Sequence, residues 1–191
     1  MNAIPNTGLI TLATIHDAAA LAVLVNSAYR GASSKKGWTT EADLLDGIRT
    51  DEASLNRIMT DTASVILKCC DSAGQLSGCV YLQKKQTILY LGMLTVAPDL
   101  QAKGTGKQLL TAAESYAKQT GCSAITMTVI SIRHELIAWY ERHGYRPTGE
   151  IQPFPSDPAF GLPKPTLEFI GMEKPILEPR NKICRFQDVN S

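Results

Sequence analysis

Two glycines and two lysines stand close together in the segment Gln101–Lys107, which reads QAKGTGK. A helix that begins there presents unpaired backbone N–H groups and the positive end of its dipole to a ligand. Glycine at positions 104 and 106 lets a phosphate approach the backbone with no Cβ atom in the way. The pattern therefore predicts a loop that binds a diphosphate group.

The two best-known phosphate-binding loops do not fit these residues. A Walker A loop requires Gly at position 101 and Ser or Thr at position 108, and both positions hold Gln. A dinucleotide-binding fingerprint requires Gly at position 109, where the chain has Leu. The loop is therefore predicted to be a diphosphate site of another class.

The flanking residues predict a strand before the loop and a long helix after it. The strand is indicated by an apolar run that ends at Pro98–Asp99, with Gly92 marking a bulge or a close backbone approach. The helix is indicated by apolar residues at helical spacing and by Gly121 as a left-handed C-cap. These apolar residues are Leu91, Met93, Leu94 and Val96 in the strand, and Leu109, Leu110, Ala113, Tyr116 and Ala117 in the helix.

With Gln101, Gly104 and Gly106 in register, the loop resembles motif A of the GNAT superfamily of N-acetyltransferases, Gln/Arg-x-x-Gly-x-Gly/Ala. In that family the loop holds the pyrophosphate of acetyl-CoA, and the strand before it offers backbone groups to the pantetheine arm. A Gly-x-Gly before a helix is also a common tight turn, so the surroundings decide. The cofactor contacts implied by the resemblance are Leu94, Thr95, Val96, Gln101, Ala102, Lys103, Gly104, Thr105, Gly106 and Lys107.

A second segment, Arg133–Tyr145, resembles GNAT motif B through Ala138-Trp139-Tyr140 and Gly144-Tyr145. The resemblance implies that Tyr140 is the general acid that protonates the departing thiolate; the alternative is a tyrosine that only packs on its helix. Arg133 stands near the position where the family often has a cofactor-binding Asn. It is predicted either to meet a phosphate or an acidic substrate, or to be an exposed arginine at a helix start.

The acceptor side is indicated by Gly37–Asp43, which together with Ala28–Gly31 looks like one subgroup of bacterial and fungal GNAT proteins. The resemblance makes Trp38 and Glu41 substrate-pocket candidates. The alternatives are that Trp38 anchors a loop and that Glu41 favours a helical first turn. Residues 87–96 contain no carboxylate, so the general base is not identified; Glu41 or Tyr90 acting through water are the candidates.

Composition limits the remaining classes of function. The 191 residues carry 19 Lys plus Arg against 18 Asp plus Glu, which argues against nucleic acid and anionic membranes as partners. The N-terminus lacks a signal-peptide pattern and no apolar run approaches eighteen residues, so a cytoplasmic protein is expected. Five cysteines without C-x-x-C spacing and three scattered histidines predict no metal site and no disulfide framework. A covalent route through Cys70 or Cys79 is less favoured than buried thiols.

The expected fold class is α/β, as one GNAT domain over residues 1–177 with a tail at 178–191. The pattern and the resemblance predict a mixed, twisted sheet of about seven strands, helices on both faces, and a splay between the two central parallel strands. A polar loop is expected at 31–37, a helix from Thr39 or Thr40 to Ile48, and a further short helix over Asp51–Met59.

The expected activity is transfer of an acetyl group from acetyl-CoA to a primary amine by direct attack in a ternary complex. A small-molecule amine is favoured because the Trp38 loop and the proline-rich segment 153–165 would enclose the acceptor. The alternatives are a non-catalytic acyl-CoA-binding or regulatory module and an enzyme for longer acyl groups. A homodimer is a further possibility.

Overall fold

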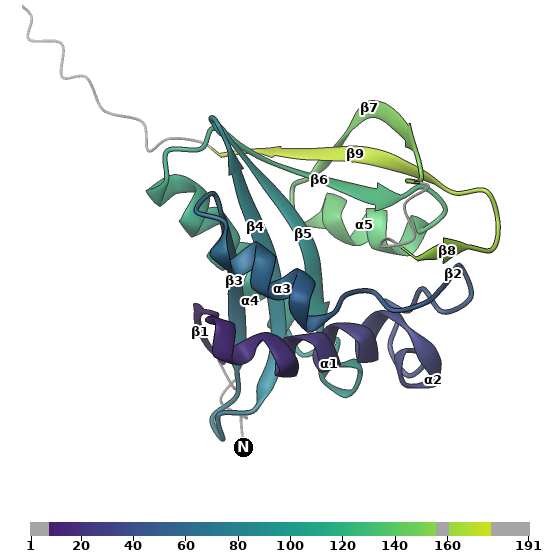
Figure 1. The fold of residues 1–191 in the computed structure, drawn as a ribbon. Helices are drawn as coiled ribbons and strands as arrows, with labels where there is room; N and C mark the ends of the chain where they lie inside the picture. The colour runs from purple at the N-terminus through teal and green to yellow at the C-terminus, as the bar shows by residue number, and fades with distance from the viewer. Residues whose placement is uncertain (1–7, 156–160, 177–191) are drawn as a thin grey trace, which may run out of the picture.

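The computed structural model describes residues 8–155 and 161–176. Its centre is a seven-stranded mixed sheet with the order β1-β3-β4-β5-β6-β9-β7 (Figure 1). The strands are β1 (Leu9–Leu12), β3 (Ser64–Cys70), β4 (Leu76–Lys85), β5 (Ile88–Val96), β6 (Ala124–Ile130), β7 (Arg146–Pro153) and β9 (Glu168–Pro175). The predicted sheet is thereby confirmed.

An antiparallel meander before the loop consists of β3, β4 and β5. The turn between β3 and β4 is built by Asp71, whose side chain accepts hydrogen bonds from the N–H groups of Ala73 and Gln75, both at 2.9 Å. Gly74 takes φ 77°, a backbone conformation that glycine adopts at little cost. Short hairpins of this kind fix the register of the three strands.

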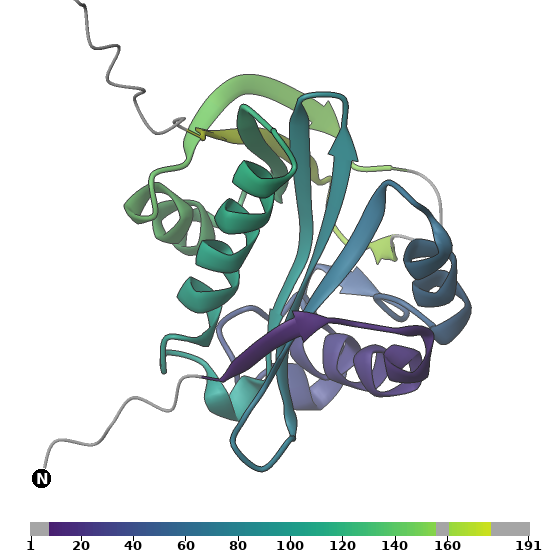
Figure 2. The ribbon, with the colours of Figure 1, turned by 90° about the vertical axis from the view of Figure 1, so that its left-hand side faces the viewer.

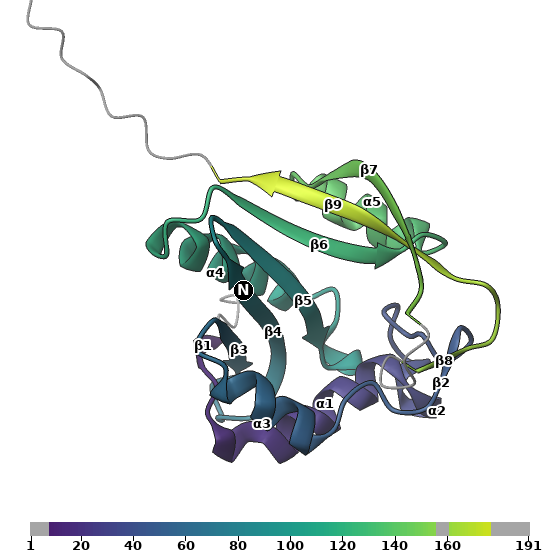
Figure 3. The same cartoon turned by 45° about the horizontal axis from the view of Figure 1, so that its top comes forward.

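The parallel pair β5 and β6 separates soon after it forms. The two strands are in register at three positions only, from Ile88 opposite Ala124 to Tyr90 opposite Thr126. Beyond Tyr90 their ribbons diverge toward the end of β5 (Figure 3). The predicted splay is confirmed, and it leaves the facing backbone groups of both strands without a strand partner there.

Helices cover both faces of the sheet, as predicted (Figure 2). The helices α1 (Ala18–Tyr29) and α3 (Glu52–Thr60) pack on one face, and α4 (Thr105–Gln119) lies on the other, beside α5 (His134–Arg142). Each face has its own apolar core, because α4 buries its apolar stripe against β3 to β5, while α1 packs against β4 and β5 and α3 packs against β3. The motif helix is thus firmly seated on the sheet.

Two predictions about the segment after α1 are wrong. The expected polar loop at 31–37 contains a short helix, α2 (Gly31–Ser34). The expected helix from 39 or 40 to 48 is absent: the N–H groups of Leu44 and Leu45 bond to the Glu41 carbonyl, and the chain then forms β2 (Leu45–Asp46), paired with β8 (Leu162–Pro163). Gly47 takes φ 86°, which breaks a right-handed helix there.

Several further expectations concern absences. Within the described ranges, no helix has the length and apolar character needed to cross a membrane, and no three potential ligands gather for a metal ion. Cys69, Cys79 and Cys122 are buried thiols and Cys70 is half-buried. Cys184 and the tail at 178–191 lie outside the described residues.

Candidate active site

The loop Gln101–Lys107, predicted to bind a diphosphate and called the diphosphate loop below, follows a 3₁₀ turn, Pro98–Leu100, and opens α4. Gly104 is the N-cap with φ 93°, and Ala102 also has a positive φ of 63°. The N–H of Gln108 donates to the Gly104 carbonyl at 3.0 Å. The N–H groups of Thr105, Gly106 and Lys107 therefore precede the first intrahelical bond. These three amides, with the helix dipole behind them, are an anion-binding arrangement.

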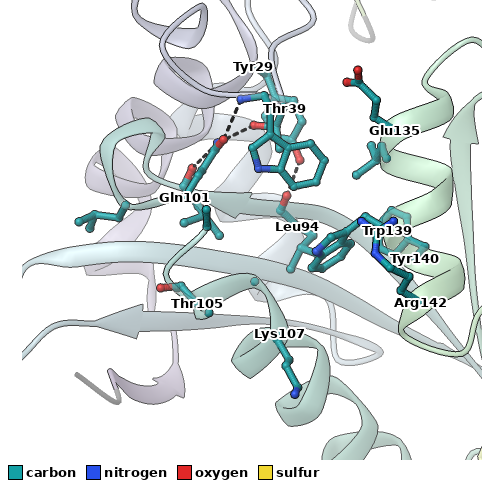
Figure 4. A pocket seen from close by; sticks show the side chains of 17 residues that line it. Tyr29, Thr39, Leu94, Gln101, Thr105, Lys107, Glu135, Trp139, Tyr140 and Arg142 are labelled. Carbon is teal, nitrogen blue, oxygen red and sulfur yellow. Dashed lines mark hydrogen bonds between the residues drawn. The ribbon is translucent and has the colours of Figure 1, made fainter. Parts of the chain in front are cut away.

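Gln101 holds this loop against the segment Trp38–Thr39. Its Oε1 accepts a hydrogen bond from the Trp38 N–H at 2.9 Å, and its Nε2 donates to Thr39 Oγ1 at 2.8 Å and to the Val96 carbonyl at 3.2 Å (Figure 4). A Cβ atom on Gly37 would lie only 2.7 Å from the Gln101 side chain. The Gln101 amide is thus occupied by protein groups, so it shapes the loop.

A bulge bends β5 beside the splay. Cys79 of β4 faces Thr95, but Tyr81 faces Gly92, so β5 holds one extra residue. The predicted bulge is confirmed, although the residue with positive φ is Met93, at 50°. Next to it, the Leu94 carbonyl accepts a hydrogen bond from the Tyr29 hydroxyl at 2.5 Å. This contact joins the end of α1 to the strand at the splay.

A cleft of about 470 Å³ runs from the loop into the splay (Figure 4). Of the ten residues predicted to bind the cofactor, eight line it: Leu94, Val96, Gln101, Ala102, Gly104, Thr105, Gly106 and Lys107. Thr95 does not, because its side chain is buried and its hydroxyl donates to the Met93 carbonyl at 3.0 Å. Lys103 is exposed outside the cleft. The remaining lining residues are Tyr29, Trp38, Thr39, Leu100, Glu135, Leu136, Trp139, Tyr140 and Arg142.

A second cavity, of about 130 Å³, opens on the other side of the splay. It shares Tyr29, Leu94, Leu136 and Tyr140 with the larger cleft, so the two spaces meet at those side chains. Glu41 and Tyr90 line this smaller cavity, and their place beside the acceptor stays a prediction. Trp38 does not; it lines the larger cleft instead.

Tyr140 lies at the junction and is only 6% exposed. Its hydroxyl forms no hydrogen bond with any described residue, so it is available to a ligand. Burial, reinforced by the neighbouring tyrosines Tyr29, Tyr145 and Tyr90, raises the pKa of Tyr140 well above its usual value of 10. The phenol therefore keeps its proton at neutral pH, as a proton donor must.

Trp139 is the wall of the cleft opposite the loop. Its ring lies 6.0 Å from that of Trp38, 5.1 Å from that of Tyr140 and 4.3 Å from that of His143, measured between centroids. A Cβ atom on Gly106 would lie 3.4 Å from the Trp139 ring. Glycine at this position thus keeps the passage between helix and ring open.

The smaller cavity contains opposite charges. Glu41 forms a mostly buried ion pair with Arg30. Tyr90 reaches across the splay, where its hydroxyl lies 3.3 Å from Thr128 Oγ1. Burial and the Glu41 charge raise the pKa of Tyr29 to about 12, while the positive charge of Arg49 opposes this shift. Tyr29 therefore stands between a carboxylate and a guanidinium.

Arg133 is the N-cap of α5 and lines the smaller cavity, so its predicted contact with an acidic substrate stays a prediction. It is half-buried, and it donates to the backbone carbonyls of Trp38 at 2.9 Å, Thr40 at 2.9 Å and Thr39 at 3.4 Å. The guanidinium thus bonds the carbonyls of Thr39 and Thr40, which the expected helix would have paired internally.

Sequence reasoning did not identify Tyr29, Trp139 or Arg142 as site residues. Trp139 precedes Tyr140 in the motif, and an adjacent aromatic on a helix facing the splay was the signal available for it. Tyr29 carried no such signal, because its partner Leu94 is 65 residues away. Arg142 and Lys107 are exposed cations at the edge of the cleft.

Comparisons with known proteins agree with this geometry. The sequence profile of the acetyltransferase (GNAT) family matches residues 35–145. YhfO of Bacillus subtilis, an uncharacterized N-acetyltransferase, is 31% identical over 145 residues, covering 71% of this chain and 88% of that protein. N-acetyltransferase family 8 member 3 of Mus musculus is 27% identical over 121 residues. The match covers 59% of this chain and 53% of the mouse protein, so it spans about half the length of that relative.

Solved structures share the fold at low sequence identity. The ribosomal-protein-S18-alanine N-acetyltransferase of Escherichia coli superposes with a TM-score of 0.68 at 17% identity, covering 91% of this chain and 97% of that one. YncA of Salmonella typhimurium, solved with its cofactor acetyl-CoA, gives 0.66 at 17% identity and covers 90% and 95% of the two chains. At these identities the likeness establishes the fold alone.

Proposed function

Because the chain belongs to the GNAT acetyltransferase family, we propose that it transfers an acetyl group from acetyl-CoA to a primary amine, by direct attack in a ternary complex. The observation that carries the proposal is the junction at Tyr140. A cleft with three unpaired helix-start amides meets a smaller, charged cavity there. One space would receive the donor and the other the acceptor.

In this proposal the amides of Thr105, Gly106 and Lys107 hold the diphosphate, and the splay receives the pantetheine arm beside Leu94 and Val96. The amine nitrogen attacks the thioester carbonyl carbon, forming the C–N bond, and the C–S bond then breaks. Tyr140 gives its proton to the sulfur, and the proton that the acylated nitrogen loses passes to solvent, from which Tyr140 recovers one. Backbone N–H groups of β5 beside the bulge stabilise the oxyanion.

An alkyl ammonium must lose a proton before it can attack, since its pKa is near ~10.4. Glu41 is the carboxylate that lines the smaller cavity among the described residues, and Tyr90 lies nearby in the same wall. We propose that Glu41 and Tyr90 bind the water molecule that receives this proton. Glu41 is paired with Arg30, so its role is to hold the ammonium and the water in place.

The test measures binding and turnover separately. Calorimetry is expected to show acetyl-CoA binding, and a thiol reagent is expected to detect CoA release that depends on an added amine. Tight binding without CoA release from any amine would instead support a non-catalytic acyl-CoA-binding module. The absence of a carboxylate on β5 favours this second candidate. Competition among acyl-CoAs of increasing chain length tests whether acetyl is the preferred group.

The acceptor we propose is a small molecule, and no nucleic acid or membrane partner is proposed. A homodimer remains a proposal, which the mass of the purified protein in solution tests.

A further inference from the structure

The smaller cavity contains a cation that no protein carboxylate neutralises within the described ranges. Arg49 lines this cavity and is half-buried. Each ion pair among the described residues joins other side chains, and the Arg49 side chain donates no hydrogen bond to any described residue. Among the described residues it has an aromatic contact with Tyr29, whose ring centroid lies 5.7 Å from the guanidinium carbon. Its N–H donors are therefore open to water or to an anionic ligand, and a guanidinium can bind a carboxylate through two parallel hydrogen bonds.

The backbone of Arg49 is fixed in place. Its N–H donates to Asn26 Oδ1 at 2.6 Å, and Asn26 Nδ2 donates to the Thr50 carbonyl at 2.8 Å. Asn26 belongs to α1, one turn before Tyr29. The arginine is therefore anchored to the same helix that supplies Tyr29 to the junction, so its distance from the reacting atoms is set by the fold.

The other charges around the cavity are already engaged. Glu41 is paired with Arg30, and Arg133 donates to three backbone carbonyls. The charged residues that line the cavity are Arg49, Arg133 and Glu41, so positive charge is in excess there. An acceptor with several positive charges would be repelled there. An acceptor with one amine and one acidic group would not.

We infer that the acceptor is a small amino acid, an amine that carries a carboxylate a few bonds away, with Arg49 binding that carboxylate. This inference rests on the proposed function and narrows its substrate class. Glu41 and Arg49 both line the cavity with opposite charge, so the cavity offers a carboxylate for the ammonium and a guanidinium for the acid. The volume of about 130 Å³ suits a small acceptor, since drug-sized sites take about 300–1,000 Å³.

Apolar side chains form the rest of the cavity wall. Phe154 and Phe169 stack with ring centroids 5.1 Å apart, and Met127 and Val129 of β6 lie on the same cavity. A short apolar side chain on the acceptor would pack against them. The Arg49 guanidinium and this wall together favour an amino acid with an apolar side chain over a charged one.

The experiment uses matched pairs of acceptors that differ in the acidic group alone: alanine with alaninamide, and valine with valinamide. Wild-type protein is expected to acetylate each acid with a kcat/KM about tenfold to a hundredfold above its amide. This preference would run against intrinsic reactivity, because the amine of an amino acid amide is less basic and more of it is neutral.

The substitution Arg49→Met should remove the preference by lowering kcat/KM for the acids and leaving the amides nearly unchanged. Arg49→Lys should restore part of it, since lysine keeps the charge but loses the bidentate geometry. Arg57→Met removes the same charge from the exposed face of α3 and should change neither substrate series. Acetyl-CoA affinity should stay at the wild-type value in all three variants, because neither arginine lines the larger cleft.

Failure of this inference and failure of the proposed function give different results. Efficient acetylation of the amides, or an equal loss of acids and amides in Arg49→Met, would overturn the inference while leaving an acetyltransferase. If no amine releases CoA, the proposed function falls. Calorimetric titration with the same pairs then tests the inference. The inference is overturned if the acids do not bind wild-type protein more tightly than the amides do.

Discussion

Replacing Tyr140 with Phe is the most direct test of the proposed chemistry. The change removes one hydroxyl oxygen from a side chain that is only 6% exposed and keeps the ring against Trp139 and Tyr145. In the described part of the chain the hydroxyl has no assigned hydrogen-bond partner, so the fold loses no bond. The free energy of unfolding should stay within about 1 kcal/mol of wild type.

The size of the catalytic effect follows from the environment of the phenol. General acid catalysis contributes about 10²- to 10⁴-fold when the donor and acceptor are well matched. Burial raises the pKa of Tyr140 well above 10, whereas a thiol titrates near ~8.5, so proton transfer to the thiolate is uphill. Because the transfer is uphill, the lower end of this 10²- to 10⁴-fold range applies. We expect kcat to fall about a hundredfold, or about 2.7 kcal/mol in the barrier.

The raised pKa also fixes the pH dependence of this step. A phenol loses its proton only as the pH rises through its pKa, and that of Tyr140 lies well above 10. Tyr140 therefore remains the protonated form over any practical assay range. Below pH 10, deprotonation of Tyr140 should therefore not lower the wild-type rate, and the pH profiles of wild type and Tyr140→Phe should have the same shape.

Tyr145→Phe is the matched control for Tyr140→Phe. Tyr145 is fully buried, its hydroxyl has no partner within the described residues, and its ring lies 5.7 Å from that of Tyr140. It lines neither cavity. This variant should keep kcat and gain about 1 kcal/mol of stability. Steady-state kinetics, acetyl-CoA calorimetry and thermal unfolding measure the two variants together. Equal loss of kcat and acetyl-CoA affinity in Tyr140→Phe would refute the acid role.

Three further substitutions test the loop and the N-terminal scaffold. Gly106→Val should weaken acetyl-CoA binding at least tenfold while the protein still folds, because the first added carbon already lies 3.4 Å from Trp139; calorimetry and thermal unfolding decide. Gln101→Leu should raise the KM for acetyl-CoA about tenfold, since it frees the loop from two hydrogen bonds to residues 38 and 39, and an unchanged KM would show that the loop holds its shape alone. Asp17→Asn should lower stability by about 1–2 kcal/mol at neutral pH. Burial alone raises the pKa of Asp17, but its contacts with Lys68 and Thr14 lower it overall. The stabilisation by Asp17 is therefore fully present above pH 3.8 and is lost as the pH falls through the folded-state pKa. In urea titrations at acid pH, the free energies of unfolding of wild type and variant should converge.

The parts of the fold that sequence reasoning predicted well are those encoded locally. The strand β6 (Ala124–Ile130) is one of them, because a β-branched run between turn signals admits few alternatives. The loop was predicted from Gly104 and Gly106 because their roles depend on backbone conformation and on the absence of a side chain. Its crossover to a parallel strand followed from the intervening helix.

The parts that were missed depend on contacts between distant residues. The segment after Trp38 has helical composition, but its carbonyls are bound by Arg133 from 95 residues away in the chain. A sequence pattern carries no information about that partner, so the local preference predicts a helix that the structure does not contain. Tyr29 ends α1 as a buried residue, and only the fold brings its hydroxyl to Leu94.

The same long-range contacts connect the two halves of the site. Residues 38–40 are held on one side by Gln101 of the diphosphate loop and on the other by Arg133 at the start of α5. Gln101 lines the larger cleft and Arg133 lines the smaller cavity. A ligand that draws the loop toward its diphosphate would therefore act on the wall of the acceptor cavity through a few hydrogen bonds. Such coupling requires that donor binding favour one position of this segment over another, and the rigid tie through Gln101 supplies the physical connection for that preference.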